Sequence, residues 1–156
     1  MIPDPVDHYL HTHHPSCEHS SHLRAVTAQR VAAAEHVSGT RLAKPVVVRL
    51  GERLVLAVIG ADRKLDLEVL SAVCGGLPAE LAPEQTFAER FAPCEPGAEP
   101  PLNMFGLPLY VDAALAREPW VVMRAGTHED TVRMSTDEWL EQEDARVVEG
   151  LGRHHL

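Results

Sequence analysis

Long apolar runs are absent from this sequence of 156 residues, although 45% of the residues are hydrophobic. No stretch approaches the roughly 20 apolar residues that a membrane-spanning helix requires. The first residues include Asp4, Asp7 and several histidines, and they lack the basic and then apolar order of a signal peptide. The length is that of one ordinary domain with a hydrophobic core. We therefore expect a soluble, cytoplasmic, single-domain protein that makes no membrane contact.

Cysteine is also scarce. The sequence has three, Cys17, Cys74 and Cys94, an odd number at wide spacings. This argues against a disulfide framework and against a compact cysteine-based zinc site, so we expect reduced thiols. The usual signatures of serine acyl-enzymes, zinc metalloproteases, P-loop hydrolases and dinucleotide-binding folds are missing as well. Acyl-enzyme chemistry, metalloprotease chemistry and nucleotide hydrolysis therefore lack their usual signatures in this sequence.

Positive charge is in short supply, since 14 basic residues face 23 acidic ones and the formal net charge is −9. Such a balance speaks against a broad basic surface for nucleic acid. The distribution is uneven, because between Arg24 and Lys64 eight basic residues accompany three acidic ones, a balance of +5 that leaves −14 for the remainder. Two interpretations stay open: a basic face for a phosphate backbone, with Arg41 and Arg49 as candidate contacts, or an ordinary solvated surface.

Periodicity and turn residues predict helices and strands in the first half of the chain. Thr27 can cap a helix to about His36. Residues 45–50 and 53–59 are β-branched runs separated by two turn residues, as in a hairpin. Asp66 can cap a helix to about Cys74, where two glycines stop it.

The second half continues this interleaving. Pro83 begins a short helix through about residue 91, and residues 107–111, 120–124 and 131–134 are predicted strands. Ser135 and Glu138 form a capping box for a last helix. That helix is expected to carry Trp139, Leu140, Val147 and Val148. Because no regular βαβ repeat is present, we predict a mixed α/β fold.

Lys44 stands at the head of the first strand of the hairpin. An ammonium group there can contact a phosphate, a terminal ribose or the negative charge that develops near an ester carbonyl. The alternative is a strand-end lysine held in water, and the residue type alone favours this alternative.

Residues 93–108 hold five prolines and two glycines, too many for a simple turn. Long ordered loops in compact domains are often functional. Gly97 allows a close approach of the backbone to a ligand, and the prolines stiffen the loop, so its peptide N–H groups are candidates to hold a carbonyl or aminoacyl group. The alternative is a stiff surface connection.

The Lys44 strand and the Gly97 loop belong to a longer series of motifs. The series comprises Thr27-Ala28-Gln29, His36-Val37-Ser38-Gly39, Ala43-Lys44-Pro45-Val46-Val47-Val48, Glu95-Pro96-Gly97-Ala98-Glu99-Pro100-Pro101, Gly106-Leu107-Pro108-Leu109-Tyr110-Val111-Asp112 and Ala125-Gly126-Thr127-His128. In register from about His22 to Leu140, it resembles the YbaK-type aminoacyl-tRNA deacylases. That family uses a lysine at the head of a strand and a Gly-x-x-x-Pro loop, here Gly97 to Pro101.

The resemblance implies a compact domain over residues 22–150, with a mixed, largely antiparallel sheet flanked by helices and a tail over residues 151–156. It implies deacylation of a mischarged tRNA that carries a small amino acid, of the prolyl-tRNA editing type, assisted by the substrate's own groups and without a cofactor. The implied catalytic residue is Lys44. The implied substrate-binding residues are His22, Thr27, Gly97, Ala98, Pro101, Gly126 and His128. For His128, a role in capping a turn stays open.

Aminoacyl-tRNA rather than DNA is the implied partner, and the sequence leaves open whether an aminoacyl-tRNA synthetase delivers it. Pro45 stands where the family usually has threonine, which removes a backbone donor and bears on the local hydrogen bonding. Leu102 and Asn103 replace a usual Phe-Gly, and these two changes bear on substrate identity more than on the reaction. A non-catalytic module of the same fold that binds tRNA or aminoacyl groups is the first alternative.

Six of the ten histidines lie in the first 22 residues, near Cys17 and Glu18. Imidazole clusters can bind zinc, nickel or copper, so a metal-dependent hydrolase is the second alternative. The spacing fits no specific zinc motif, and we interpret residues 1–21 as a flexible, histidine-rich extension. On this interpretation, removal of residues 1–20 leaves folding and activity largely intact, as does a chelator.

Overall fold

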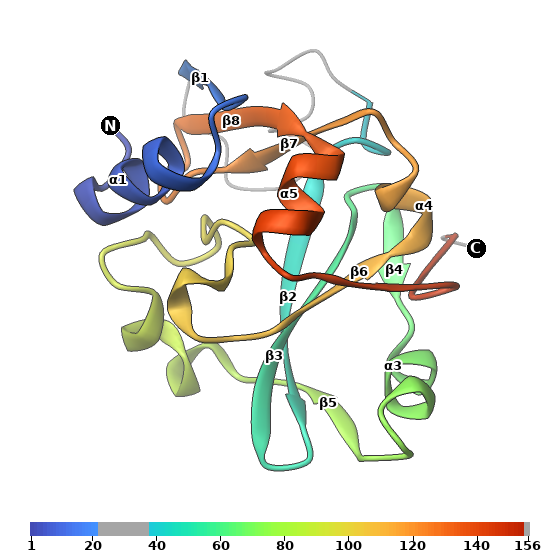
Figure 1. The fold of residues 1–156 in the computed structure, drawn as a ribbon. Helices are drawn as coiled ribbons and strands as arrows, with labels where there is room; N and C mark the ends of the chain where they lie inside the picture. Colours follow the sequence, from blue (N-terminus) through green and yellow to red (C-terminus); the bar gives the residue numbers. More distant parts are fainter. Residues whose placement is uncertain (22–37, 155–156) are drawn as a thin grey trace.

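The centre of the fold is a β-hairpin of two eight-residue strands, β2 (Ala43–Leu50) and β3 (Arg53–Gly60). In the computed structural model, which describes residues 1–21 and 38–154, the strands pair antiparallel along their whole length (Figure 1). The turn includes Gly51, whose φ of 63° lies in the left-handed region that glycine adopts without strain. The predicted hairpin is confirmed.

Three short strands complete a five-stranded sheet in the order β5-β2-β3-β6-β9. They are β5 (Ala79–Leu81), β6 (Leu109–Asp112) and β9 (Arg146–Val148). Strand β5 runs antiparallel to β2, whereas β6 runs parallel to β3 and β9 runs parallel to β6. Parallel neighbours need long crossover connections, and segments that contain helices supply them here. The mixed α/β fold that the sequence predicts is confirmed.

Two smaller sheets accompany this one. Strands β1 (Glu18–Ser21), β7 (Trp120–Arg124) and β8 (Asp130–Ser135) form an antiparallel sheet in the order β1-β8-β7. Strands β4 (Arg63–Leu65) and β10 (Gly152–His154) form an antiparallel ribbon. A parallel bridge between Leu42 and Val122 joins the three-stranded sheet to the start of β2. The Lys44 end of the hairpin therefore meets the end of β7.

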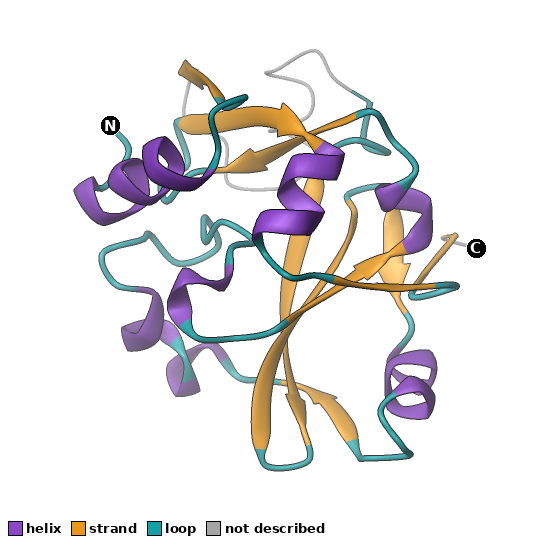
Figure 2. Cartoon of the chain, viewed as in Figure 1, coloured by secondary structure: helices purple, strands orange, loops and turns teal. Residues whose placement is uncertain are grey.

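Helices and short 3-10 turns fill the connections (Figure 2). Within the described part of the chain, the helices between the strands are α3 (Leu67–Val73), α4 (Ala113–Ala116) and α5 (Thr136–Gln142). The Asp66 carboxylate accepts from the N–H groups of Glu68 and Val69 at 3.1 and 3.2 Å, and the Ser135 hydroxyl accepts from the N–H of Glu138 at 3.3 Å. Both predicted N-caps are confirmed.

Two predicted helices differ from the structure. The segment after Pro83 forms two 3-10 turns, η1 (Glu84–Thr86) and η2 (Ala88–Phe91), and a third, η3 (Asn103–Phe105), lies in the proline-rich segment. The last helix ends before Asp144, whose φ of 50° is left-handed, so Val147 and Val148 lie on β9 instead. The helix predicted from Thr27 lies outside the described residues.

The two faces of the hairpin belong to two apolar clusters. Successive side chains of a strand point to opposite sides, so Leu56 and Val58 join the larger cluster while Ala57 and Ile59 join the smaller one. The larger cluster includes the fully buried Trp139 of α5, and the smaller one is covered by α3. Because both faces are buried, a shift of the hairpin by one residue would move its apolar side chains to the wrong cluster.

The amino-terminal residues are part of the core. Asp4–His13 form helix α1, and β1 pairs with β8. Val6 and Leu10, one helical turn apart, are 0% and 3% exposed within the larger cluster. The prediction of a flexible extension over residues 1–21 is therefore wrong, because this apolar pair gives the helix a buried face.

A buried polar network fastens α1 to the rest of the chain. His14 Nε2 lies 2.6 Å from Oε2 of Glu143, and the Tyr9 hydroxyl donates to the same carboxylate at 2.8 Å. The N–H of Asn103 donates to Oε1 of Glu143 at 2.6 Å. Burial, together with this carboxylate, raises the pKa of Tyr9 above its usual range, so the phenol stays a donor. Loss of these partners would leave a buried carboxylate unpaired, which is costly.

The carboxyl-terminal residues are also integrated. Leu151 is fully buried, and residues Gly152–His154 pair with β4. The predicted tail from residue 151 is therefore wrong up to His154, because an apolar side chain and a strand pairing hold it. None of the described helices is long and apolar enough to cross a membrane.

We expect Leu10→Ala to lower the free energy of unfolding by about 2 to 5 kcal/mol, since it removes buried methyl groups and leaves a cavity. Chemical denaturation of the purified protein measures this change. Val73→Ala trims a side chain that is 51% exposed on α3 and serves as the control, with an expected change under about 1 kcal/mol. Equally small effects of both substitutions would instead support the interpretation of residues 1–21 as a flexible extension.

Candidate functional site

Lys44 and Gly97, far apart in the sequence, line one cavity of about 270 Å³. The other described residues that line it are Leu42, Ala43, Pro45, Glu99 and Arg124. The start of β2, the Gly97 loop and the end of β7 thus surround a single hollow. The structure brings together the two features that the sequence identified separately.

Lys44 is the second residue of β2 and lies opposite Ile59 of β3. Its side chain is half-buried. Strand β5 pairs only with residues Val48–Leu50, so it leaves the Lys44 end of β2 uncovered. Lys44 takes part in none of the ion pairs within residues 1–21 and 38–154. Its ammonium group can therefore contribute positive charge to the cavity.

The loop around Gly97 is held by its own groups. Gly97 has a φ of 84°, and its N–H donates to Oε1 of Glu99 at 3.0 Å. Ala98 is fully buried, and its N–H donates to the carbonyl of Glu95 at 2.9 Å. The predicted use of loop N–H groups to hold a ligand needs a correction here, because both of these groups are already bonded. A ligand oxygen reaches the N–H of Gly97 only when the Glu99 carboxylate moves.

The loop is hydrogen-bonded to the turn between β7 and β8. The N–H of Gly126 donates to the carbonyl of Ala98 at 2.9 Å, and the N–H of Glu95 donates to the carbonyl of Gly126 at 2.8 Å. Gly126 has a φ of 98°, and a Cβ at this position would lie 2.8 Å from Cδ of Pro3 and 3.3 Å from Sγ of Cys94. Gly126 therefore supports the loop and is not among the described residues that line the cavity.

His128 and Pro101 likewise hold the loop without lining the cavity. His128 is 4% exposed, its Nε2 lies 2.9 Å from the carbonyl of Pro96, and its N–H donates to Oε1 of Glu95 at 2.8 Å. The Trp139 indole donates to the carbonyl of Pro101 at 3.0 Å. These contacts fix the two ends of the loop to the β7–β8 turn and to α5.

Glu99 and Arg124 are cavity residues that the sequence reasoning missed. Arg124 donates a hydrogen bond to the carbonyl of Gly97. Burial lowers the pKa of Arg124, and the Glu99 carboxylate opposes that shift. Two signals were present, since Glu99 lies inside the Gly-x-x-x-Pro pattern and Arg124 directly precedes the 125–128 motif. His22 and Thr27, which the sequence also placed in the site, lie outside the described residues.

The amino-terminal histidines have separate structural roles. His14 pairs with Glu143, whereas Nε2 of His19 lies 2.7 Å from Oδ1 of Asp130. Burial by itself would raise the pKa of Asp130, but hydrogen bonds from Thr127, the terminal amino group and His19 outweigh it and hold the pKa below its usual range. Within residues 1–21 and 38–154, no group of three histidine, cysteine or acidic side chains is placed to hold a metal ion.

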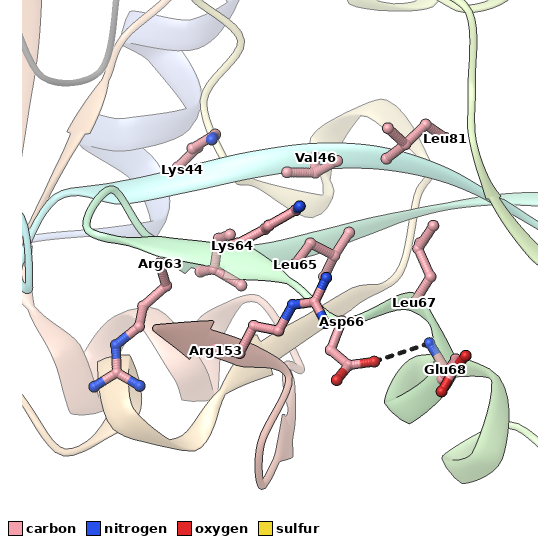
Figure 3. A pocket seen from close by; sticks show the side chains of 11 residues that line it. Lys44, Val46, Arg63, Lys64, Leu65, Asp66, Leu67, Glu68, Leu81 and Arg153 are labelled. Atoms are coloured by element: carbon pink, nitrogen blue, oxygen red, sulfur yellow. Dashed lines mark hydrogen bonds between the residues drawn. The ribbon is translucent and has the colours of Figure 1, made fainter. Parts of the chain in front are cut away.

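A second and larger cavity of about 550 Å³ also has Lys44 in its wall (Figure 3). Its other lining residues are Val46, Ile59, Arg63, Lys64, Leu65, Asp66, Leu67, Glu68, Leu81 and Arg153. Apart from Lys44, none of these lines the first cavity. Lys44 is thus the junction between two hollows of different character.

Comparison with known proteins gives matches in sequence and in structure. A sequence model of the aminoacyl-tRNA editing domain matches residues 22–141. None of the curated proteins matches significantly. A solved structure from work on epitope backbone grafting onto scaffold proteins by computational design has 22% identity and a TM-score of 0.84 over 97% of each chain.

Two further structures are similar. A candidate trans-editing enzyme for prolyl tRNA synthetase has 22% identity and a TM-score of 0.83, over 97% of this chain and 96% of that one. The hypothetical protein APE2540 has 20% identity and a TM-score of 0.84, over 95% of this chain and 99% of that one. At such identities, these structures establish the likeness of the fold alone.

We expect Gly126→Ala to destabilise the protein by several kcal/mol, because the new methyl group must displace the ring of Pro3 as well as tolerate a left-handed backbone. Gly150→Ala is the matched control, since Gly150 has a φ of 76° and no atom within 4 Å of a Cβ. It should cost only the backbone strain of about 1 kcal/mol. Chemical denaturation compares the two, and equal losses would mean that the turn does not bear on Pro3.

Proposed function

We propose that this chain, which belongs to the family of aminoacyl-tRNA editing domains, is a freestanding aminoacyl-tRNA deacylase. It acts in trans on a mischarged tRNA and hydrolyses the ester between a small amino acid and the terminal ribose. The observation that carries this proposal is the shared cavity, in which Lys44 and the Gly97 loop face one hollow of about 270 Å³.

Hydrolysis of this ester needs little chemical activation. Water adds to the carbonyl carbon, the bond from that carbon to the ribose oxygen breaks, and a proton passes to the ribose oxygen. The products are the free amino acid and the uncharged tRNA. Most of the rate enhancement comes from the placement of the water and from stabilisation of the negative charge on the carbonyl oxygen.

Lys44 and Arg124 are the two cations among the described residues that line the cavity. The Lys44 ammonium is the group that stabilises the developing oxyanion or a neighbouring phosphate. It is carried by a strand that packs against the core on both faces. Arg124 donates to the carbonyl of Gly97, so it holds the loop against the end of β7 and acts as a positioning residue. Loop and cation are thereby kept at a fixed separation, which is what transition-state stabilisation requires.

Glu99 is the carboxylate among the described residues that line the cavity. Its hydrogen bond to the N–H of Gly97 supports two roles. If the bond persists when substrate binds, the free carboxylate oxygen can orient the attacking water. If the substrate displaces it, the N–H of Gly97 becomes a donor to the substrate oxygen, and hydrolysis depends on the substrate's own groups instead.

The size of the cavity supports a small amino acid as the ester's acyl group. Its volume of about 270 Å³ lies just below the roughly 300 to 1,000 Å³ that ligand sites occupy. One structure of the same fold is a candidate trans-editing enzyme for prolyl tRNA synthetase, which supports a reaction of the prolyl-tRNA editing type. A synthetase partner that hands over the tRNA is consistent with this proposal.

We expect Lys44→Ala to reduce kcat for deacylation on the order of 100-fold, because it removes a positioned charge. Its melting curve should match that of the wild type, since a strand-end lysine adds little packing. Arg146→Ala removes an exposed charge from β9, at the opposite edge of the sheet, and is the control with unchanged activity. Radiolabelled amino acid released from mischarged tRNA gives the rates.

Full activity in well-folded Lys44→Ala would overturn the mechanism. If the wild type binds tRNA but hydrolyses none of a panel of mischarged tRNAs, the non-catalytic binding module replaces the deacylase.

Glu99→Gln separates the two roles of Glu99. The amide oxygen can still accept from the N–H of Gly97, but it cannot take a proton, so a water-orienting carboxylate predicts a loss in kcat of about 100-fold or more. Glu99→Ala serves as the companion variant, because it also removes the contact with the loop. Near-normal rates in both variants would assign the water activation to the substrate.

A further inference from the structure

The larger cavity carries an unusual arrangement of charge. Lys64 of β4 and Arg153 of β10 are register partners in an antiparallel ribbon, so two exposed cations stand directly opposite each other. Like charges in this position destabilise a strand pair. None of the ion pairs within the described part of the chain involves Lys64 or Arg153. The repulsion between them is relieved when an anion lies between the two side chains.

The Lys64 and Arg153 side chains are oriented so that an anion in the larger cavity could contact both. In Figure 3 the Lys64 amine extends toward β2 on the side of Val46, and the Arg153 guanidinium lies beside Leu65, whereas Arg63 points away. Arg63 and Lys64 are neighbours on β4, so their side chains project to opposite sides of the strand. Arg63 lies 3.8 Å from the carboxylate of Asp62, so its charge is partly matched. Three cations, from β2, β4 and β10, therefore converge on the cavity.

The acidic residues of the cavity do not cancel this charge. The Asp66 carboxylate is engaged by the N–H groups at the start of α3. Glu68 is exposed on the first turn of the same helix. Among the described residues, the three converging cations outnumber these two acids in the lining, so the cavity stays positive in a chain of net charge −9.

The remaining wall of the cavity is apolar. It is formed by Val46, Ile59, Leu65, Leu67 and Leu81. Leu81, on the edge strand β5, is 60% exposed, which is a high value for a large apolar side chain on a strand. An apolar wall beside a row of cations suits a ligand that combines flat apolar faces with phosphates, as an unpaired nucleotide does.

We propose that this cavity binds the unpaired 3′-terminal nucleotides of the tRNA acceptor strand, with phosphates at Lys64 and Arg153 and bases against the Leu65 and Leu81 side. The proposal rests on the deacylase function. An ester held in the smaller cavity is attached to the last ribose, so the preceding nucleotides must leave that cavity past its rim. Lys44 belongs to both cavities and marks the point where the strand crosses from one to the other.

The two basic residues that the sequence offered as phosphate contacts are placed elsewhere. Arg41 pairs with Glu118 and lies over the ring of Trp120. Arg49 stands at an odd position of β2 and so projects to the face opposite Lys44. Among the described residues, the basic residues between Arg24 and Lys64 therefore do not form one surface. Lys44 and Lys64 instead line the larger cavity together with Arg153, from the other end of the chain.

The test combines binding with kinetics in the double variant Lys64→Ala/Arg153→Ala. Binding is measured by fluorescence anisotropy with a labelled single-stranded RNA that ends in CCA, over a range of salt concentrations. Loss of two phosphate contacts should lower the slope of log affinity against log salt by about 1.4, at roughly 0.7 per contact for a single strand. Arg146→Ala is the matched control and should keep the wild-type slope.

Deacylation by the same variants gives the second measurement. We expect KM for mischarged tRNA to rise about tenfold in the double variant while kcat stays within about twofold, because the docking contacts lie away from the ester. Lys44→Ala should instead lower kcat. The melting temperature of the double variant without RNA should equal or exceed that of the wild type, since a repulsion has been removed.

Two results distinguish this inference from the deacylase function itself. A double variant that keeps both the wild-type affinity for RNA and the wild-type salt slope overturns the docking site, even if the wild type deacylates normally. A wild type that shows the expected RNA binding, with its dependence on Lys64 and Arg153, but hydrolyses no aminoacyl ester overturns the deacylase and leaves the docking site in place.

Discussion

The pairing of β2 with β3 over eight residues, with both faces buried, is the constraint on which the rest of the structure depends. Its register decides which side chains enter each of the two clusters, and it fixes Lys44 opposite Ile59. Because β5 covers only residues Val48–Leu50, the same strand is a rigid core element at one end and the wall of a cavity at the other. The packing of this strand sets the position of Lys44, so packing in the core bears directly on the chemistry of the site.

The Gly97 loop depends on a different kind of contact, the backbone pairing with the β7–β8 turn at Gly126. Pro3 fills the space beside this glycine, so the amino-terminal segment, the loop and the turn meet at one point. The site is therefore assembled from parts that are distant in sequence, and its residues divide into those that line the cavity, such as Lys44, and those that hold its wall, such as His128.

Much of the fold was predictable because its signals are local. The hairpin, the Asp66 cap and the Ser135 cap each depend on a few neighbouring residues, and all three were found from the sequence. The amino-terminal helix was missed because only two apolar residues, Val6 and Leu10, mark its buried face among many histidines. For the site, the motifs indicated Lys44 and the Gly97 loop, whereas Arg124 enters through a tertiary contact with a loop carbonyl. The sequence of β7 contains no pattern that predicts this contact.

Cys94 lies against Gly126, where the loop meets the β7–β8 turn, so the reactivity of its thiol depends on this contact. Burial, with a further contribution from Glu99, raises the pKa of its thiol to about 12, so in neutral solution almost none of it is the reactive thiolate. A thiol reagent should therefore modify the buried Cys94 slowly while the loop stays paired with the turn at Gly126. An alkylation rate at Cys94 above that of a buried thiol would report separation of the loop from this turn.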